Sequence, residues 1–246
     1  MPTEALFRDE QYLKATDAVV VGINDRGGLI LDRTIFYATS GGQPGDTGRM
    51  LREDGSHIAI ATTVTGETKD DIIHVPAEGA ALPDIGETLR LEIDWERRLR
   101  LMRMHTACHL LSVVCPFPIT GAAVGEEESR VDLDVPDPSY TREMVTEKIM
   151  ELVHGNHPIF TQWITDEELQ AKPTLIKSKN VRPPIGTGRI RLVCIGERSS
   201  VDSQPCGGTH VANTSEVGEI HISKIEKKGR ENRRFRLRFG PLPASA

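Results

Sequence analysis

The sequence has 246 residues, which is long enough for two domains of roughly 100–200 residues each. Hydrophobic residues make up 38% and charged residues 27% of it, a balance that excludes a disordered chain and indicates a globular protein. No stretch approaches the ~18 apolar residues of a membrane span, and the N-terminus lacks the features of a secretory signal. We therefore expect a cytoplasmic protein without a membrane partner.

The net charge of −6 is distributed unevenly along the chain. Residues 1–95 carry 8 Lys and Arg against 17 Asp and Glu, a net charge of −9. Residues 96–246 carry 22 against 19, a net charge of +3, and residues 224–246 alone hold 8 basic and 2 acidic residues. A nucleic acid would therefore meet the second part of the chain, although a basic end can also simply solvate a surface.

Residues 1–94 are predicted to form a small β-rich domain, either a barrel or a sandwich. Short apolar runs alternate with turn signals, and residues 24–28 read as a hairpin connection. Short strands at this spacing are typical of a small barrel or sandwich. The expected strands are 19–23, 29–32, 57–64, 72–75 and 88–93.

Residues 95–246 are predicted to form an α+β domain with an antiparallel sheet. Helical spacing covers residues 95–114, where Leu99, Met102, Leu110 and Val113 can share one face. A second helix is expected at 139–154, and residues 165–168 have the form of a capping box that opens a third. The expected strands are 119–124, 130–135, 159–164, 190–195, 219–227 and 234–239.

Two pairs of residues have the spacing of metal ligands. His105 and His109 are four residues apart in the predicted helix, so both imidazoles lie on one face and can reach one ion. Cys206 and His210 are also four apart, and the glycines at 207 and 208 predict a tight turn between them. Three nitrogens and one sulfur suit tetrahedral Zn²⁺, so we expect one zinc ion per chain.

The chemical role of such an ion stays open at this stage. Four protein ligands close a tetrahedral site, and closed sites are usually structural, whereas catalytic zinc typically keeps one open position. Either one ligand is loosely held, or the metal organises a pocket in which another group positions water. Cys108 points to another face of the helix and is expected to be a buried core residue.

A glycine-rich segment at residues 31–48 combines hydroxyl side chains, the adjacent Gly41 and Gly42, and Gln43. Backbone without side chains can approach a ligand closely, and polar neighbours can then recognise a small polar group. Composition alone favours a plainer interpretation, which is a strand followed by a long turn.

Taken together, these motifs resemble the editing region of alanyl-tRNA synthetase and its free-standing relatives, the AlaX proteins. The sequences at 105–111 and 206–210 are similar to the two zinc motifs of the family, and residues 31–48 resemble the glycine-rich segment of the barrel that precedes the editing domain. The resemblance covers residues 19–239, and the layout is similar to the medium-length AlaX form. Flanking agreement is found at 131–134, 202–205 and 211–214.

The resemblance implies a zinc-dependent aminoacyl-tRNA deacylase that edits mischarged alanine tRNA in trans. Its partner would be tRNA(Ala) charged with serine or glycine. The resemblance also places Thr34 and Gln43 near the substrate, where the barrel and editing domains meet. We expect the Thr34 hydroxyl to bind the serine side chain, and Gly41 and Gly42 to admit the aminoacyl group.

Five basic residues near the C-terminal end are expected to hold tRNA phosphates, namely Lys227, Lys228, Arg230, Arg233 and Arg234. No residue stands out as a general base, and the oligomeric state is not predicted.

Two alternative functions remain open. The first is a metal hydrolase for another substrate, such as a threonine-bearing aminoacyl-tRNA or a peptide. The sequence lacks the Glu that follows the first histidine of the HExxH peptidase motif, which counts against peptide hydrolysis. The second is a non-catalytic zinc module that binds tRNA, which four closed ligands would fit.

Overall fold

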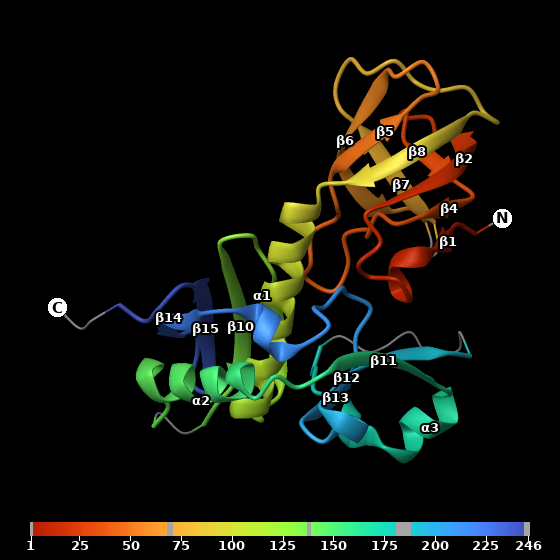
Figure 1. Ribbon diagram of the computed structural model, residues 1–246. Coiled ribbons are helices and arrows are strands. Elements are labelled where there is room, and N and C mark those ends of the chain that lie inside the picture. Colours follow the sequence, from red (N-terminus) through yellow and green to blue (C-terminus); the bar gives the residue numbers. More distant parts are fainter. Residues whose placement is uncertain (1, 68–70, 137–138, 181–187, 244–246) are drawn as a thin grey trace. The chain divides into compact units, whose positions relative to one another are not determined.

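The computed structural model describes residues 2–67, 71–136, 139–180 and 188–243 (Figure 1). The chain divides into two compact units, Met1–Leu99 and Arg100–Ala246. Helix α1 (Trp95–Val114) begins at the residue where the sequence predicts both a helix and a domain boundary, and its first residues belong to the first unit.

The first unit is a closed barrel of six strands in the order β2-β3-β7-β6-β5-β8 (Figure 1). Neighbouring strands around the barrel are antiparallel. A short strand β1 (Glu4–Ala5) pairs in parallel with β4 (Arg33–Thr34), and a 3₁₀ helix covers Leu6–Arg8. The barrel strands are β2 (Ala15–Ile23), β3 (Leu29–Leu31), β5 (Gly48–Leu51), β6 (His57–Thr65), β7 (Ile72–Pro76) and β8 (Thr88–Ile93).

Alternation of apolar and polar residues along the strands explains why the barrel has an apolar core. Along β8, Leu89, Leu91 and Ile93 are buried while the residues between them are exposed or half-buried, because successive side chains of a strand point to opposite faces. The inward side chains of the other strands join them in one core. Closure leaves the six-stranded sheet without an edge. The prediction of a small β-barrel is confirmed, although β5 is a strand that the sequence pattern did not indicate.

The second unit combines helices with two antiparallel sheets, which confirms the predicted α+β class (Figure 1). One sheet has the order β14-β15-β10-β9 and the other the order β11-β12-β13. Helices α2 (Arg142–His154) and α3 (Asp166–Ala171) and the 3₁₀ helices Pro173–Leu175, Glu197–Ser199 and Thr214–Val217 complete it. The strands are β9 (Ile119–Ala123), β10 (Glu128–Asp134), β11 (Ile159–Ile164), β12 (Ile190–Ile195), β13 (Asp202–Pro205), β14 (Ile220–Lys227) and β15 (Asn232–Phe239).

The four-stranded sheet has one apolar and one charged face. Val131 and Leu133 of β10 and Phe235 and Leu237 of β15 are at most 1% exposed, whereas the residues that alternate with them are polar. Helix α2 packs against β14, and the Thr146 hydroxyl accepts a hydrogen bond from the backbone N–H of Ile222 at 3.0 Å. The helix therefore anchors the edge of this sheet.

Helix α1 is more deeply buried than its sequence pattern predicts. Met102 and Leu110 are fully buried, but Leu99 and Val113, which were expected on the same face, are only half-buried. Between residues 101 and 112, each residue except Arg103 is buried. Neighbouring chain therefore covers this half of the helix on most sides, a degree of burial that helical spacing alone does not predict.

No helix among the described residues combines the length and apolar character that a membrane span requires.

Candidate metal centre and glycine-rich segment

The structure brings together the four residues that the sequence predicts as metal ligands. The candidate ligand atoms of His105, His109, Cys206 and His210 all lie within 4.8 Å of one another. Helix α1 presents the two histidines one turn apart, with ring centroids separated by 5.2 Å. Cys206 directly follows strand β13, and the chain then turns so that the His210 ring lies 4.3 Å from the His105 ring.

The distances in the cluster fit a tetrahedral zinc ion. The Cys206 sulfur lies 3.5 Å from Nε2 of His105 and 3.4 Å from Nε2 of His210. Zinc bonds of ~2.3 Å to sulfur and ~2.0 Å to nitrogen, at the tetrahedral angle, separate two such ligand atoms by about 3.5 Å. The donor set of three imidazoles and one thiol is also one that zinc prefers. The residues present therefore fit Zn²⁺.

Burial keeps the three imidazoles in the form that binds a metal. It lowers the pKa of His105 and of His210 well below the ordinary value, and that of His109 to about 3. A neutral ring has a nitrogen lone pair for a ligand bond. Nδ1 of His109 is buried and has no hydrogen-bond partner among the described residues.

Burial raises the pKa of the Cys206 thiol, so the proton must leave when a metal binds. Cys108, by contrast, lies outside the cluster, and burial raises the pKa of its thiol to about 12. The structure thus places Cys108 as a buried residue of the helix, as the sequence predicts.

Arg191 holds the turn that carries two of the candidate ligands. This residue of β12 is 6% exposed, and its Nη1 donates to the carbonyl oxygens of Cys206 and Gly208 at 2.9 Å each. The backbone N–H of Gly208 in turn points to the Cys206 sulfur at 3.4 Å. Sequence reasoning missed Arg191, although a basic residue inside an otherwise apolar strand is a signal for a buried polar role.

A polar network supports the other side of the cluster. The Ser112 hydroxyl donates to the backbone carbonyl of His109 at 2.7 Å and accepts from Lys177 at 3.1 Å. Lys177 also forms an ion pair of 2.5 Å with Asp202, which accepts from the Gln204 amide at 2.7 Å. These contacts tie the metal-ligand part of α1 to strand β13. Sequence reasoning noted residues 202–205 only as part of the resemblance.

The paired glycines of the glycine-rich segment form a tight exposed turn. Ser40 and Gln43 exchange two backbone hydrogen bonds of 3.1 and 2.9 Å, and Gly41 and Gly42 between them have φ angles of 57° and 86°. Positive φ at both central residues defines a turn that glycine adopts without strain. A Cβ on Gly41 would meet no atom within 4 Å, so backbone conformation rather than crowding requires this glycine.

A buried ion pair fixes both ends of the same segment. Asp46 and Arg98 are at most 1% exposed, and Nε of Arg98 donates to both carboxylate oxygens at 2.9 Å. Asp46 also accepts the backbone N–H of Tyr37 at 2.6 Å, while Arg98 donates to the carbonyl of Ile35 at 2.7 Å. The segment is therefore held rigidly within the first unit. Sequence reasoning missed this pair.

Thr34 and Gln43 are both fully buried. Thr34 belongs to β4, and its hydroxyl contacts Nε2 of His74 inside the barrel unit. Recognition of serine by Thr34, and a substrate contact by Gln43, Gly41 or Gly42, stay predictions.

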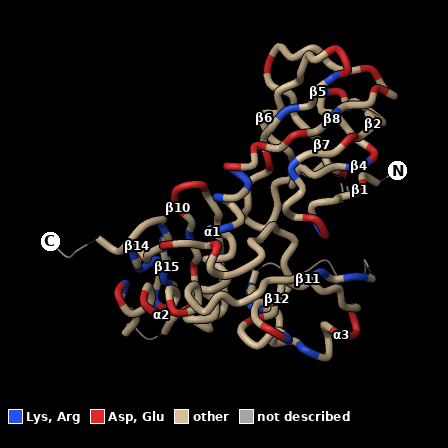
Figure 2. Tube along the Cα trace, in the orientation of Figure 1, with Lys and Arg blue, Asp and Glu red and all other residues tan. Residues whose placement is uncertain are grey.

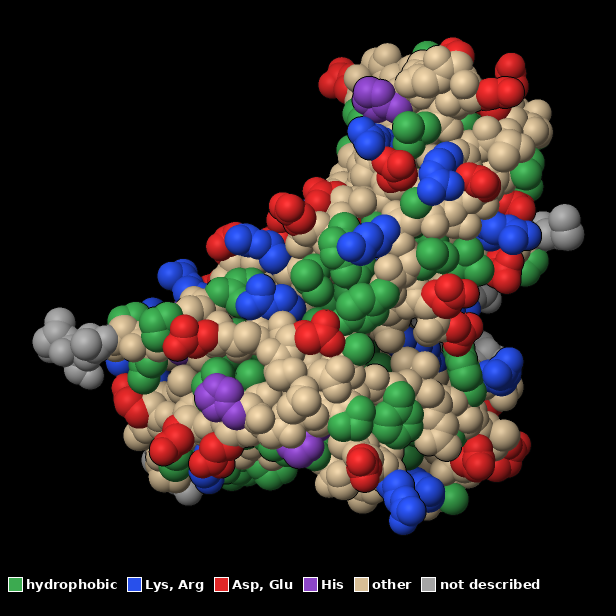
Figure 3. Space-filling view, in the orientation of Figure 1, with side chains coloured by type: hydrophobic (Ala, Val, Ile, Leu, Met, Phe, Trp, Pro, Cys, Tyr) green, Lys and Arg blue, Asp and Glu red, His purple; other side chains and the backbone are tan. Residues whose placement is uncertain are grey.

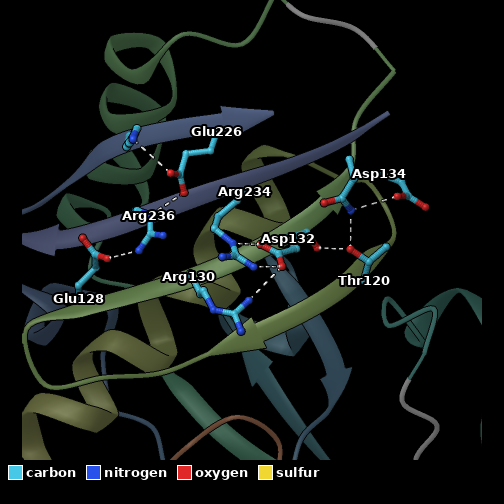
Figure 4. Close-up of polar contacts among 10 residues, drawn as sticks. Thr120, Glu128, Arg130, Asp132, Asp134, Glu226, Arg234 and Arg236 are labelled. Carbon is cyan, nitrogen blue, oxygen red and sulfur yellow. Dashed lines mark hydrogen bonds and ion pairs between the residues drawn. The ribbon is translucent and has the colours of Figure 1, made fainter. Parts of the chain in front are cut away.

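The five predicted phosphate-binding residues gather on one hairpin, β14–β15. Lys227, Lys228 and Arg230 are exposed there. Arg233 donates to backbone carbonyls of the connecting turn, and Arg234 makes two bonds of 2.7 and 2.8 Å to the Asp132 carboxylate (Figure 4). Arg234 is only 17% exposed, so its charge is already matched by a carboxylate.

Charge pairing continues along strands β10, β14 and β15 of this sheet. Arg236 bonds both Glu128 and Glu226, and Arg130 bonds Asp132 (Figure 4). The bond from Arg236 lowers the pKa of Glu226 to about 2. Figure 2 shows acidic and basic residues interspersed along the chain, and Figure 3 shows their side chains mixed over the visible surface. The exposed hairpin tip is therefore a stronger candidate for phosphate contacts than the paired arginines.

Two family models match this chain. One, described as tRNA synthetases class II (A), matches residues 3–97, and the other, described as the threonyl and alanyl tRNA synthetase second additional domain, matches residues 190–236. The first match covers the barrel unit, and the second covers β12 to most of β15, including Cys206 and His210. The fold and the cluster thus define a relative of synthetase-associated domains.

Full-length relatives define the family. The chain is 35% identical over 243 residues to the alanyl-tRNA editing protein AlaX-M of Methanosarcina acetivorans, covering 95% of this chain and 97% of that one. It is 32% identical over 236 residues to the AlaX-M protein of Saccharolobus solfataricus, again covering 97% of that protein. It is 31% identical to an alanine–tRNA ligase of Saccharolobus islandicus, of which it spans 25%. The chain belongs to the AlaX-M family of alanyl-tRNA editing proteins.

Proposed function

We propose that this protein hydrolyses the aminoacyl ester of tRNA(Ala) that carries serine or glycine instead of alanine. The observation that carries the proposal is the cluster of His105, His109, Cys206 and His210, found in a chain that matches alanyl-tRNA editing proteins along nearly their whole length. The match to a quarter of an alanine–tRNA ligase supports the same activity, because it points to a module that also occurs within the charging enzyme.

Physical chemistry explains why such a hydrolase is needed. A site that accepts alanine rejects an analogue with one added hydroxyl by only ~10²-fold, and it cannot exclude the smaller glycine by size. For the seryl form, a second site that forms a hydrogen bond with the serine hydroxyl can discriminate serine from alanine by ~10⁴–10⁵-fold, because alanine would leave a buried polar group unpaired. Trans-editing supplies that second site on a separate protein.

The metal that fits the cluster is Zn²⁺, with His105, His109, Cys206 and His210 as its ligands. A bound zinc ion would supply a fixed positive charge that can polarise a carbonyl oxygen. The other contributions come from the chain itself: Arg191 holds the ligand turn in shape, and the buried pair of Asp46 and Arg98 orders the glycine-rich segment. Since four protein ligands close a tetrahedral site, ordering the ligand-bearing segments is part of the role that we assign to zinc.

Deacylation of tRNA(Ala) charged in turn with serine, glycine and alanine tests the proposal directly. We expect hydrolysis of the seryl and glycyl forms and survival of the alanyl form. A variant with Cys206→Ala and His210→Ala is the matched control for metal dependence. Faster hydrolysis of a threonine-bearing tRNA would instead favour a different editing substrate. Binding without hydrolysis of any charged form would favour a non-catalytic tRNA-binding module, which the closed ligand set also fits.

A further inference from the structure

A threonine next to one metal ligand contacts the ring of another. Thr106 follows His105 in helix α1 and is fully buried. Its Oγ1 lies 3.1 Å from Nδ1 of His210 and 3.4 Å from the backbone nitrogen of Val211. The side chain therefore joins the helix that carries two ligands to the turn that carries the other two, across 104 residues of sequence.

The other ring nitrogen of His210 determines the direction of this hydrogen bond. Nε2 lies 3.4 Å from the Cys206 sulfur, so it is the nitrogen that faces the cluster. A nitrogen that binds a metal must have its lone pair free, and a neutral imidazole then carries its proton on the other nitrogen. Nδ1–H of His210 is thus the donor and the Thr106 oxygen is the acceptor. The Val211 N–H occupies the second acceptor position of the same oxygen.

We propose that Thr106 is a positioning residue for the metal centre, which fixes the tautomer and the ring orientation of His210. The inference depends on the proposed zinc site, but the role of Thr106 can be refuted while the zinc site stands. Residues that accept the second N–H of a ligating histidine typically change metal affinity by 10–100-fold when they are replaced.

Zinc affinity of the full-length protein, measured by competition with a chromophoric chelator, provides the first test. Thr106→Val keeps the side-chain shape and removes the acceptor, so we expect a 10–100-fold weaker zinc affinity. Thr106→Ser keeps the hydroxyl and should bind within a few-fold of the wild type. Thr146→Val is the matched control, because Thr146 is also a buried helical threonine that accepts a backbone N–H, from Ile222. This control should lose stability without losing zinc affinity.

The possible outcomes distinguish the positioning role of Thr106 from the existence of the zinc site. Equal zinc affinity in wild-type protein and Thr106→Val would refute the positioning role while leaving the zinc site in place. A wild type that binds no zinc would refute the zinc site and the role of Thr106 with it. Weakening by Thr146→Val as large as that by Thr106→Val would show that general destabilisation, rather than the contact with His210, lowers the affinity.

A measurement on the wild type alone keeps the proposal testable if Thr106→Val fails to fold. Nitrogen-15 NMR of the zinc-loaded protein reports which ring nitrogen of each histidine carries the proton. We expect His210 to carry it on Nδ1, with Nε2 shifted by the metal. A proton on Nε2 of His210 would overturn the inference.

Discussion

Thr34 and His74 form a closed hydrogen-bonded pair, with Oγ1 of Thr34 2.7 Å from Nε2 of His74. Nδ1 of His74 lies 3.1 Å from the Leu29 carbonyl, which can only accept, so Nδ1 carries the proton and Nε2 accepts from the Thr34 hydroxyl. The Thr34 oxygen in turn accepts the backbone N–H of Phe36 at 3.0 Å. Because its proton is committed to His74, Thr34 can serve a ligand only as an acceptor, and a serine hydroxyl is a donor of the required kind.

Replacement of Thr34 by Val tests its role in serine recognition. The substitution keeps the shape and removes the acceptor, at a cost of roughly 1–3 kcal/mol, so hydrolysis of seryl-tRNA(Ala) should fall about 5- to 150-fold. Glycine has no hydroxyl, and hydrolysis of glycyl-tRNA(Ala) should change much less. Deacylation rates on both substrates, with a melting curve, check this. Equal losses on the two substrates, together with a lower melting temperature, would mean that Thr34 serves only the barrel.

The buried His74 should make the protein less stable in mild acid. Burial lowers its pKa from 6.5 to about 4 in the folded state. Between these two values the unfolded chain binds a proton that the folded chain does not, so stability falls as the pH is lowered. The contribution of neutral His74 to the free energy of unfolding is complete above pH 6.5, and it decreases by about 3 kcal/mol as the pH falls to 4.

Denaturant unfolding of wild type and His74→Phe between pH 4 and 7 measures this effect. The variant retains an aromatic ring beside Phe36, whose ring centroid lies 5.4 Å from that of His74, and its stability should depend less steeply on pH. His57→Phe removes an exposed histidine of the same barrel and is the matched control for the loss of an imidazole. Parallel curves for wild type and His74→Phe would show that another group titrates.

Zinc content should depend on all four residues of the cluster. We expect one zinc ion per chain in the wild type and its loss in the double variant Cys206→Ala, His210→Ala, because two ligands cannot hold the ion tightly. Cys108→Ala, which replaces a thiol outside the cluster, should retain zinc. Metal analysis of the purified proteins checks this. Full zinc occupancy in the double variant would refute the assignment of these four residues as zinc ligands.

Binding of tRNA should depend on the exposed tip of the β14–β15 hairpin. Replacing Lys227, Lys228 and Arg230 by Ala should weaken binding and reduce its salt dependence by roughly two to three units in log–log slope if all three meet phosphates. Arg234→Gln should have a smaller effect, because the Arg234 guanidinium is committed to Asp132. Binding constants over a salt series check this. An unchanged slope in the triple variant would mean that tRNA binds another surface of the protein.

Local pattern alone was sufficient for several features of this protein. Alternation of apolar residues predicts β8 at its observed bounds, and helical spacing predicts α1 from Trp95 to Val114. The four-residue spacing of His105 and His109 predicts a pair of imidazoles on one helical face. Each of these features depends on residues that are only a few positions apart in the chain, so the sequence pattern predicts them directly.

Only tertiary structure decided which distant groups meet. No local rule brings Cys206 and His210 to the histidines of α1, and none points to Thr106 as the acceptor for His210. The same holds for the pairing of Arg234 with Asp132, which removes a basic residue from the surface charge that composition alone counts. These partners are about a hundred residues apart, and packing of sheets and helices selects them. Sequence order therefore determined most of the helices and strands and the types of the candidate ligands, whereas burial and packing determined which hydrogen bonds and charges remain available for chemistry.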